Sequence, residues 1–400
     1  MVKWPVTTFE KLYEIPSRNG LSKPSRVRGS GYKMINMGEL FANDRIYDIN
    51  MELVPLTDIE KEKAKILPFD LLFARQSLVA AGAGKCSIVM ETSDLTVFES
   101  HLIRVRLNKL IADPFFYYYY FRSSCSPMQT IIQHCVQAGI KASDLSKLEV
   151  VVPPLCAQRK ISSVLMSIDK KIEENKKINK NLEHQAEAIF QSILSNAITT
   201  VNLGKIADVK GGKRLPKGVN LIDIPNTHPY IRVRDLNNVL FASLTPDYAY
   251  VDEETQKSIS RYIVSTGDVL ISIVGTIGLT AIVDSTLDKA NLTENCVKVT
   301  NLKHITPEYL LLYLRSQSGR EAITKGTVGA VQQKLPIKNI QAIPIPLLSE
   351  RDKTTLFCTL DSIFDEISSN VIQSTKLVSL RDTLLPKLMS CELDVSAIDL

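Results

Sequence analysis

Residues whose types could support phosphate or phosphodiester chemistry occur in this chain, but their spacing does not fit. The stretch "AGAGKCS", residues 81–87, resembles a phosphate-binding loop, yet Val79 stands where the motif needs glycine and Cys86 where it needs serine or threonine. The pair Pro246-Asp247 is followed by no acidic-x-lysine, so the common nuclease arrangement is missing. The sequence therefore predicts neither a nucleotide site nor a nuclease centre.

Other catalytic and metal-binding patterns are also missing from the sequence. The five histidines follow neither HxxxH nor HExxH spacing. No Gly-x-Ser-x-Gly elbow occurs, nor an Asn-Pro-Pro-aromatic or Asp-Pro-Pro-aromatic tetrapeptide of the kind that an amino-methyltransferase uses. Asp70 and Asp268 each precede an apolar segment, and we predict turn residues there rather than a catalytic pair. We expect no enzymatic activity, no cofactor and no metal in this chain.

Polar loops in two separate regions carry side chains that suit contact with duplex DNA. Reading base edges needs donors such as arginine, lysine, asparagine and glutamine, while other basic side chains hold phosphates. Glycines in these loops would let the backbone approach a phosphate. Each position could equally be an ordinary surface residue. The candidate DNA-binding residues are Arg18, Asn19, Lys23, Arg26, Arg28, Arg75, Gln76, Lys210, Lys213, Arg214, Lys217, Arg232, Arg234, Gln332, Gln333 and Lys334.

The elements that must position these loops occur twice along the chain. "LMSIDKKI" (165–172) matches "FCTLDSIF" (357–364), which places Asp169 over Asp361. Upstream, "FDLLFA" (69–74) matches "GDVLIS" (267–272) in the same order. Internal repeats of this kind define the architecture. Each half is predicted to be one variable domain followed by one helical segment.

The aromatic run "DPFFYYYYFRSS" (113–124) could be a stacking platform for bases or a buried helix. The repeat places it over "TPEYLLLYLRSQ" (306–317), where leucines stand in place of tyrosines. Leucine fills the same space but cannot stack on a base. Asp113 and Thr306 each precede a proline, as an N-cap residue precedes the first helical turn. The sequence therefore predicts a buried helix in both halves.

Two long helices follow the variable domains. Apolar residues recur at alternating spacings of four and three, which is the heptad pattern of a coiled coil. Asn175 and Asn179 lie in the same seam, Pro386 is predicted to end or kink the second helix, and the charged run 170–180 is most simply a solvated face. Connectivity favours an antiparallel pair. The predicted interface residues are Ile161, Leu165, Ile168, Ile172, Leu182, Ile189, Phe357, Leu360, Phe364 and Ile367.

Together the repeat and the helices predict the domain organisation. We expect a variable domain over 1–155, a central helix over 156–198, a second variable domain over 199–347 and a C-terminal helix over 348–400. The predicted fold class is mixed α/β: two globular domains, separated by a long antiparallel two-helix coiled coil, with an internal pseudo-twofold repeat.

Composition agrees with a globular protein and limits its surroundings. The chain has 400 residues, 44% hydrophobic content and a net charge of +5, which is compatible with a DNA partner. Its seven cysteines lack CxxC spacing and favour reduced thiols in the cytoplasm. The most apolar run, residues 269–283, is too short to span a bilayer, so no membrane association is expected.

These features resemble the specificity subunit of a Type I restriction-modification system. The resemblance covers the whole chain and depends on "PPLCAQRKI" leading into a helix with "SID", on "GDVLISIVGTIG", and on the terminal "LRDTLLPKLMSCEL" (380–393). Where the terminal motif usually has glycine, this chain has Cys391.

The resemblance implies a protein that binds double-stranded DNA without chemistry of its own. Each variable domain would be a target-recognition domain that reads one half of an asymmetric bipartite target. The helices would set the spacer and dock two modification subunits, which methylate adenine with S-adenosylmethionine. Restriction subunits, which use ATP and Mg²⁺, would complete the complex.

Two other classes of protein stay open on the sequence alone. One is a coiled-coil scaffold that binds protein without reading DNA sequence. The other is an orphan or fused enzyme. The target bases cannot be derived from residue types, because readout also depends on loop geometry and on DNA shape.

Overall fold

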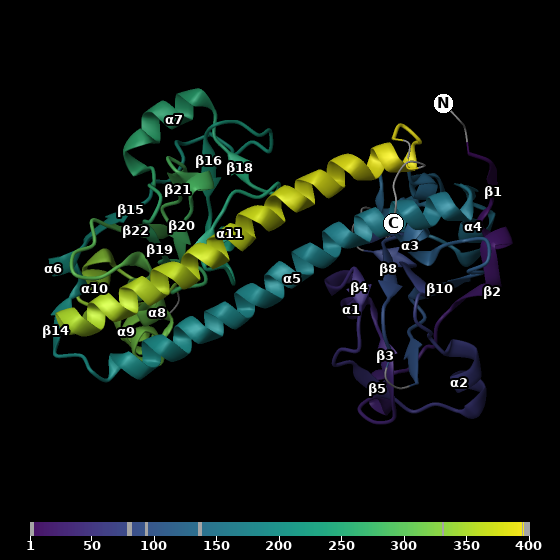
Figure 1. Cartoon of the computed structure of the whole chain (residues 1–400), viewed down its shortest axis with the longest axis horizontal. Coiled ribbons are helices and arrows are strands. Elements are labelled where there is room, and N and C mark those ends of the chain that lie inside the picture. Colours follow the sequence, from purple (N-terminus) through teal and green to yellow (C-terminus); the bar gives the residue numbers. More distant parts are fainter. Residues whose placement is uncertain are drawn as a thin grey trace. The chain divides into compact units, whose positions relative to one another are not determined.

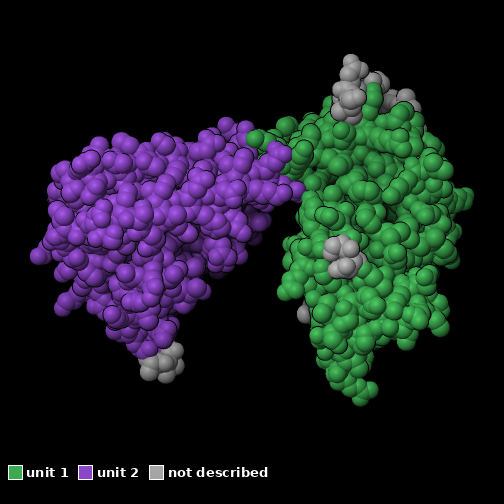
Figure 2. Space-filling view, turned by 60° about the horizontal axis from the view of Figure 1, so that its bottom comes forward, with its two compact units in different colours: residues 1–172, 377–400 green, residues 173–376 purple. Residues whose placement is uncertain are grey.

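The computed structural model describes residues 4–77, 82–92, 95–134, 138–329, 332–393 and 395. The chain divides into two compact units, coloured separately in Figure 2. Unit 1 holds Met1–Ile172 and Leu377–Leu400, and unit 2 holds Glu173–Lys376. The long helices α5 (Leu155–Leu194) and α11 (Glu350–Met389) each contribute to both units.

Unit 1 is built on a five-stranded sheet whose strand order is β2-β10-β6-β8-β4. Neighbouring strands are antiparallel except β4 and β8, which run parallel. A three-stranded sheet, β5-β3-β9, and a strand pair, β1-β13, complete the unit. The strands are β1 Val6–Thr8, β2 Tyr13–Asn19, β3 Tyr32–Ile35, β4 Arg45–Ile46, β5 Glu52–Val54, β6 Leu71–Ala74, β8 Cys86–Val89, β9 Thr96–Phe98, β10 Leu102–Leu107 and β13 Glu149–Val151.

Unit 2 repeats the order of these three sheets, and Figure 1 labels β15, β22, β19 and β20 of its large sheet. Its five-stranded sheet has the order β15-β22-β19-β20-β17, again with only the last pair parallel. The sheet β18-β16-β21 and the pair β14-β23 match the smaller sheets of unit 1. The strands are β14 Thr199–Asn202, β15 Asp208–Gly211, β16 Pro229–Ile231, β17 Phe241–Ala242, β18 Ala249–Tyr250, β19 Val269–Ser272, β20 Thr280–Val283, β21 Asn291–Leu292, β22 Cys296–Thr300 and β23 Pro344–Leu347.

Short helices and a small ribbon fill the remaining connections. The helices are α1 Met37–Ala42, α2 Asp58–Ala64, α3 Pro114–Arg122, α4 Ala142–Lys147, α6 Leu203–Ile206, α7 Glu253–Ile259, α8 Pro307–Arg315, α9 Gln317–Gly326 and α10 Ile337–Gln341. In unit 1, β7 Gln76–Ser77, β11 Gln133–His134 and β12 Ala138–Gly139 form a separate three-stranded sheet. The predicted mixed α/β class, with a repeated domain and two long helices, is therefore confirmed.

The central strand of each large sheet is buried on both faces, which explains its unbroken apolar sequence. In β6, Leu71 and Phe73 pack in a core with α3 and the long helices, whereas Leu72 packs in a second core on the other face. In β19, Val269 and Leu270 divide in the same way between two cores. Each large sheet thus has a hydrophobic core on either face.

The aromatic run is a buried helix, as predicted. Its six consecutive residues from Phe116 to Phe121 are all buried in α3, and Asp113 caps the helix by accepting a hydrogen bond from the backbone N–H of Phe115. In unit 2, Thr306 caps α8 by accepting from the N–H of Tyr309. The tyrosines are therefore core residues and offer no surface for base stacking.

Asp70 and Asp268 are turn residues, also as predicted. Asp70 Oδ2 accepts a hydrogen bond of 2.8 Å from the N–H of Leu67, and Asp268 Oδ2 accepts one of 2.9 Å from the N–H of Ser265. Each carboxylate then pairs with a cation on the neighbouring strand, at 2.7 Å from Arg106 and 3.3 Å from Lys298.

The two long helices run antiparallel. Within unit 2, Asn175 Nδ2 donates to Gln373 Oε1 and Ser374 Oγ, whereas Asn179 Nδ2 donates to the earlier carbonyl of Ile367. An increasing residue number in α5 therefore meets a decreasing number in α11. The asparagines lie in the seam, as the heptad pattern predicted.

Most predicted interface residues of the helices are buried, but one large side chain was missed. Leu182, Ile189 and Phe357 are only partly buried, whereas the unpredicted Phe190 is 1% exposed with its ring 5.1 Å from that of Tyr309. The C-terminal end of α5 packs on the core of unit 2 as well as on α11, so a second face of the helix is covered. The fully or largely buried predicted positions are Ile161, Leu165, Ile168, Ile172, Leu360, Phe364 and Ile367.

Of the two outcomes predicted at Pro386, an end to the helix does not occur. The helix continues beyond this proline to Met389, because Leu388 and Met389 are both buried in the core of unit 1. The helix is followed by Cys391, whose φ of 61° is the left-handed conformation that favours glycine. This conformation suits the glycine that the family resemblance implies at this position.

Candidate nucleic-acid interface

One end of the large sheet of unit 2 brings together a basic loop and a short ribbon. The basic loop is residues 210–217, and its backbone is held against the start of β22 by a 3.0 Å hydrogen bond from Gly212 N–H to the carbonyl of Cys296. A Cβ on Gly212 would lie 2.0 Å from the carbonyl oxygen of Thr293, so only glycine fits this close approach. Four basic side chains of this loop are exposed: Lys210, Lys213, Arg214 and Lys217.

The ribbon of unit 2 consists, in its described part, of Val328–Gly329 and Gln332–Lys334. Val328 and Lys334 exchange backbone hydrogen bonds of 2.9 and 2.8 Å, which close the ribbon. The next residue, Leu335, donates to the carbonyl of Ile273, and the N–H of Ile273 donates to the carbonyl of Asn295. Segment 293–296 therefore lies between the two features: it bonds to the basic loop at Gly212 and, through Ile273, to the end of the ribbon at Leu335.

Unit 1 has the same arrangement at the same end of its sheet. A Cβ on Gly20 would lie 2.1 Å from the carbonyl oxygen of Phe98, as at Gly212. Arg75 N–H donates to the carbonyl of His101, and Ile140 N–H donates to the carbonyl of Arg75. The ribbon here is β11 and β12, next to β7 with Gln76. Of the predicted DNA-binding residues of unit 1, this end gathers Arg18, Asn19, Arg75 and Gln76.

Lys23, Arg26 and Arg28 lie in a loop over the smaller sheet of unit 1. Lys23 Nζ pairs with Glu60 at 2.8 Å, and Arg28 Nη1 pairs with Glu52 at 2.6 Å. Arg28 Nε also donates to the carbonyl of Lys23. Lys23 and Arg28 therefore hold the fold of the loop, and Arg26 is exposed on the short turn between them.

Arg232 and Arg234 also make contacts within the chain. Arg232 binds Asp235 with distances of 3.0 and 3.1 Å and donates to the carbonyl of Asp247. Arg234 donates to the same carbonyl at 3.3 Å. Five of the predicted positions, three in unit 1 and two in unit 2, thus lie outside the two sheet ends.

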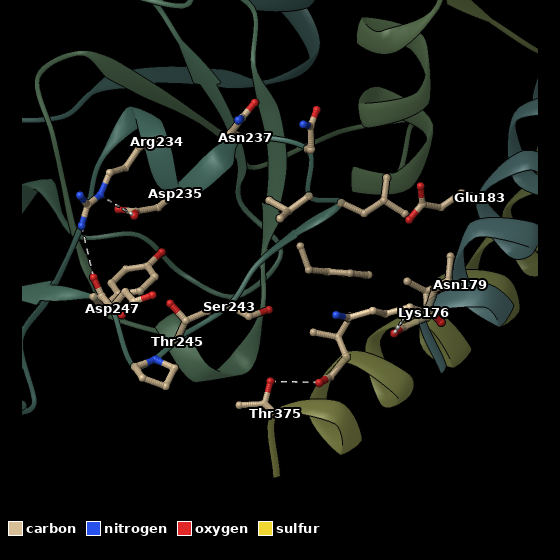
Figure 3. Close-up of a pocket in the computed structure, with 18 of the residues that line it drawn as sticks. Lys176, Asn179, Glu183, Arg234, Asp235, Asn237, Ser243, Thr245, Asp247 and Thr375 are labelled. Atoms are coloured by element: carbon tan, nitrogen blue, oxygen red, sulfur yellow. Dashed lines mark hydrogen bonds and ion pairs between the residues drawn. The ribbon is translucent and has the colours of Figure 1, made fainter. Parts of the chain in front are cut away.

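A groove of unit 2, with a volume of about 980 Å³, was not foreseen from the sequence (Figure 3). Lys176, Asn179 and Glu183 of α5 line one side, and the segment 234–248 lines the other. Burial raises the pKa of Glu183, and the positive charge of Arg315 offsets this rise only in part. The hydroxyl of Tyr248 is buried and has no hydrogen-bond partner among the described residues. No sequence pattern could have revealed the groove, because its walls come from segments far apart in the chain.

A buried polar cluster of unit 1 was also missed. Arg45 Nη2 donates to Asp169 Oδ2 at 2.7 Å, and the hydroxyl of Tyr119 donates to the same oxygen at 2.6 Å. Arg381 Nη1 donates to Asp169 Oδ1 at 2.9 Å. Burial raises the pKa of Tyr119 well above its usual value. The cluster connects strand β4 and helix α3 to both long helices.

Metal and membrane sites have no support among the described residues. No group of three or more histidine, cysteine, aspartate and glutamate residues in that part of the chain could hold a metal ion. Within the same residues, no helix has the length and apolar character to cross a membrane. The described part of the phosphate-loop-like stretch, from Gly82, leads into strand β8 and not into a helix.

Comparison with known proteins gives a family for most of the chain. The model of the "Type I restriction modification DNA specificity domain" matches residues 1–184 and 197–374. These two matches correspond to the two copies of the internal repeat. No curated protein sequence is similar enough to the chain to count as a relative.

Solved structures show a related fold. The S subunit of a Type I restriction-modification system from M. genitalium aligns with 97% of this chain and 96% of its own, with a TM-score of 0.59 and 15% identity. The HsdS subunit from Thermoanaerobacter tengcongensis aligns with 98% of this chain and 97% of its own, with a TM-score of 0.31 and 16% identity. The first likeness supports the fold described above, whereas the second is too distant to add to it.

Proposed function

Because the chain belongs to the family of Type I restriction-modification DNA specificity subunits, we propose that each unit reads one half of a bipartite target through the sheet end described above. The family role is DNA sequence specificity, without catalysis by this chain. The finer assignment to a particular end of each sheet depends on the geometry of the two loops and ribbons.

One observation carries this proposal: equivalent ends of two matching sheets present different side chains. Lys213 and Arg214 follow the close-packed Gly212 in unit 2, where unit 1 has Leu21 and Ser22 after Gly20. Two units that share a topology but carry different side chains at the contact surface would read different bases. We therefore propose that the target is asymmetric.

The helices have a separate role in the proposal. They would set the spacer between the half-sites and dock two modification subunits, which would carry S-adenosylmethionine and methylate adenine. Restriction subunits with ATP and Mg²⁺ would join this core in the cytoplasm. No residue of this chain is proposed to hold a cofactor.

The proposal is tested by selecting duplexes from a random library with the full chain assembled with its modification subunits. The expected result is one asymmetric motif of two unequal half-sites with a fixed spacer. Lys213→Ala should weaken binding to all sequences and lower the salt slope by about one unit, as loss of a phosphate contact does. Binding without any sequence preference would favour the alternative, a protein-binding coiled-coil scaffold.

A further inference from the structure

The two ribbons occupy equivalent places, but they differ in which side chains are exposed there. Its closing pair, Val328 and Lys334, corresponds in unit 1 to the paired residues Gln133 and Gly139. Gln333 therefore stands where unit 1 has Ala138, which is buried. The ribbon of unit 2 projects a side chain into solvent at a position where unit 1 packs one into its core.

Among the described residues, the side chains of Val328, Gln332 and Gln333 in the unit 2 ribbon take part in no hydrogen bond or ion pair. Val328 is 50% exposed although it is apolar, and Gln332 and Gln333 are both exposed. Their amide groups have no hydrogen-bond partner among the described residues. By contrast, Arg28, Arg214 and Arg232 all pair with carboxylates of their own unit. The two amides lie in the same ribbon as the exposed, apolar Val328. Together they form a surface suited to a ligand that carries hydrogen-bonding groups and a methyl group.

The backbone of the ribbon is fixed by a glycine. Gly329 has a φ of 104°, and a Cβ there would lie 2.4 Å from the carbonyl oxygen of Gln332. Any other residue would force the two sides of the ribbon apart. Because Val328 and Lys334 pair closely, the backbone positions of Gln332 and Gln333 are restricted. Less conformational entropy is therefore lost when these residues bind a ligand.

We propose that this ribbon enters the major groove and reads an A·T base pair in the half-site of unit 2. The major groove admits a two-stranded ribbon, a glutamine amide pairs with N6 and N7 of adenine, and an apolar side chain contacts the methyl group of thymine. Gln332 or Gln333 supplies the amide and Val328 the apolar contact. This inference rests on the proposed DNA-reading function of the sheet ends.

The neighbouring cations have a different task in the same complex. Lys334 follows the glutamines directly, and the basic loop lies across the adjacent strands. Lysine is a point charge that suits phosphate, whereas a glutamine carries no charge and gains nothing from a phosphate beyond one hydrogen bond. The ribbon thus gives specificity, and the basic loop gives affinity that depends on salt.

The test compares Gln332→Ala and Gln333→Ala with the wild type in the library selection, using the full chain with its modification subunits. The matched control is Gln317→Ala, an exposed glutamine on α9 of the same unit. At least one ribbon variant should lose roughly 10- to 100-fold preference at a single A·T pair or two adjacent pairs of one half-site. The other half-site, the salt slope and the control should stay unchanged.

A gain of new specificity is the sharper measurement. Arginine binds guanine O6 and N7 as glutamine binds adenine, so Gln333→Arg or Gln332→Arg should shift that position from A·T towards G·C. Equal weakening at all positions, or an unchanged motif in all four variants, would overturn the inference while the wild-type motif still supports the proposed function. A wild type that selects no motif would instead contradict the proposed function itself.

Discussion

The two units share a topology but are attached to the long helices by different chemistry. In unit 1, Arg45, Tyr119 and Arg381 surround Asp169 in a buried polar cluster. The equivalent positions of unit 2 are apolar, namely Phe241, Leu312 and Ile189. Only the acid is retained, as Asp361, and it is exposed.

Unit 2 uses ring packing where unit 1 uses charge. The ring of Phe241 lies 6.0 Å from that of Phe364, whose neighbours belong to the same core as Ile189. A buried ion pair contributes little net stability over apolar packing, but it fixes which groups must meet. The repeat therefore preserves strand order and helix register, whereas the side chains that hold each unit to the long helices differ between the two copies.

The largest predicted effect distinguishes the two aspartates. Asp169→Ala removes the acceptor for three donors, among them Arg45, whose side chain is 8% exposed. We expect unit 1 to lose about 3–5 kcal/mol in its free energy of unfolding. The matched variant Asp361→Ala should change unit 2 by less than about 0.5 kcal/mol. Urea unfolding, with hydrogen exchange to follow each unit separately, measures both changes in the free energy of unfolding. Equal changes would show that the two aspartates contribute equally to stability.

A smaller effect is predicted for the tyrosine hydroxyls. Tyr119→Phe removes a hydrogen bond to a charged carboxylate, which costs about 1.5–3 kcal/mol. Tyr309→Phe in unit 2 removes a bond of 2.7 Å to the neutral carbonyl of Pro346, at a cost of about 1 kcal/mol. Urea unfolding of both variants would show whether charge makes the difference. If Tyr119→Phe cost no more than Tyr309→Phe, Asp169 would not act as a charged acceptor.

The ends of the two long helices give a third contrast. Cys391, after α11, has a left-handed backbone, whereas the first described residue with a positive φ after α5 is Gly218, more than twenty residues beyond that helix. We expect Cys391→Gly to stabilise unit 1 by about 1 kcal/mol, because glycine adopts this conformation without strain. Thermal unfolding measures the gain. As a control, Cys358→Gly in the interior of α11 should destabilise by about 1 kcal/mol.

The smallest predicted effect concerns the caps of α3 and α8. Burial raises the pKa of Asp113, although hydrogen bonds from Ser162 and from the backbone oppose it. A raised carboxyl pKa in the folded state means that stability falls as pH rises through the carboxyl range towards neutrality. Asp113→Thr, the residue of unit 2 at this position, removes that dependence. The variant should gain stability relative to the wild type as the pH rises above the ordinary range of a carboxyl group, and a difference that does not change with pH would contradict the raised pKa.

The sequence alone predicted the parts of the fold that depend on local pattern. The repeat, the caps at Asp113 and Thr306, the burial of the tyrosines and the asparagine seam are all visible as spacing or residue type. The heptad pattern failed at Phe190 because a heptad describes one seam, whereas the end of α5 packs on two surfaces. Pro386 failed as a stop signal because burial of the following turn outweighs the lost hydrogen bond.

The site was harder to predict than the fold. Arg28 and Arg232 have the residue types of DNA contacts, but the structure uses them within the chain. Arg45 and Asp169 are 124 residues apart, and no local pattern indicates that they meet. The groove and the two sheet ends also form only when distant segments fold together. Residue type proposed a chemistry for these positions, and only tertiary contacts show which side chains stay available for a ligand.

The central claim, that two matching units read two different half-sites, is tested most directly by mapping methylated adenines. Cells that carry the chain with its modification subunits would be compared with cells that lack the chain. The account predicts a single asymmetric motif, with two unequal half-sites and a fixed spacer, that disappears without the chain. A palindromic motif, or methylation that persists without the chain, would contradict it.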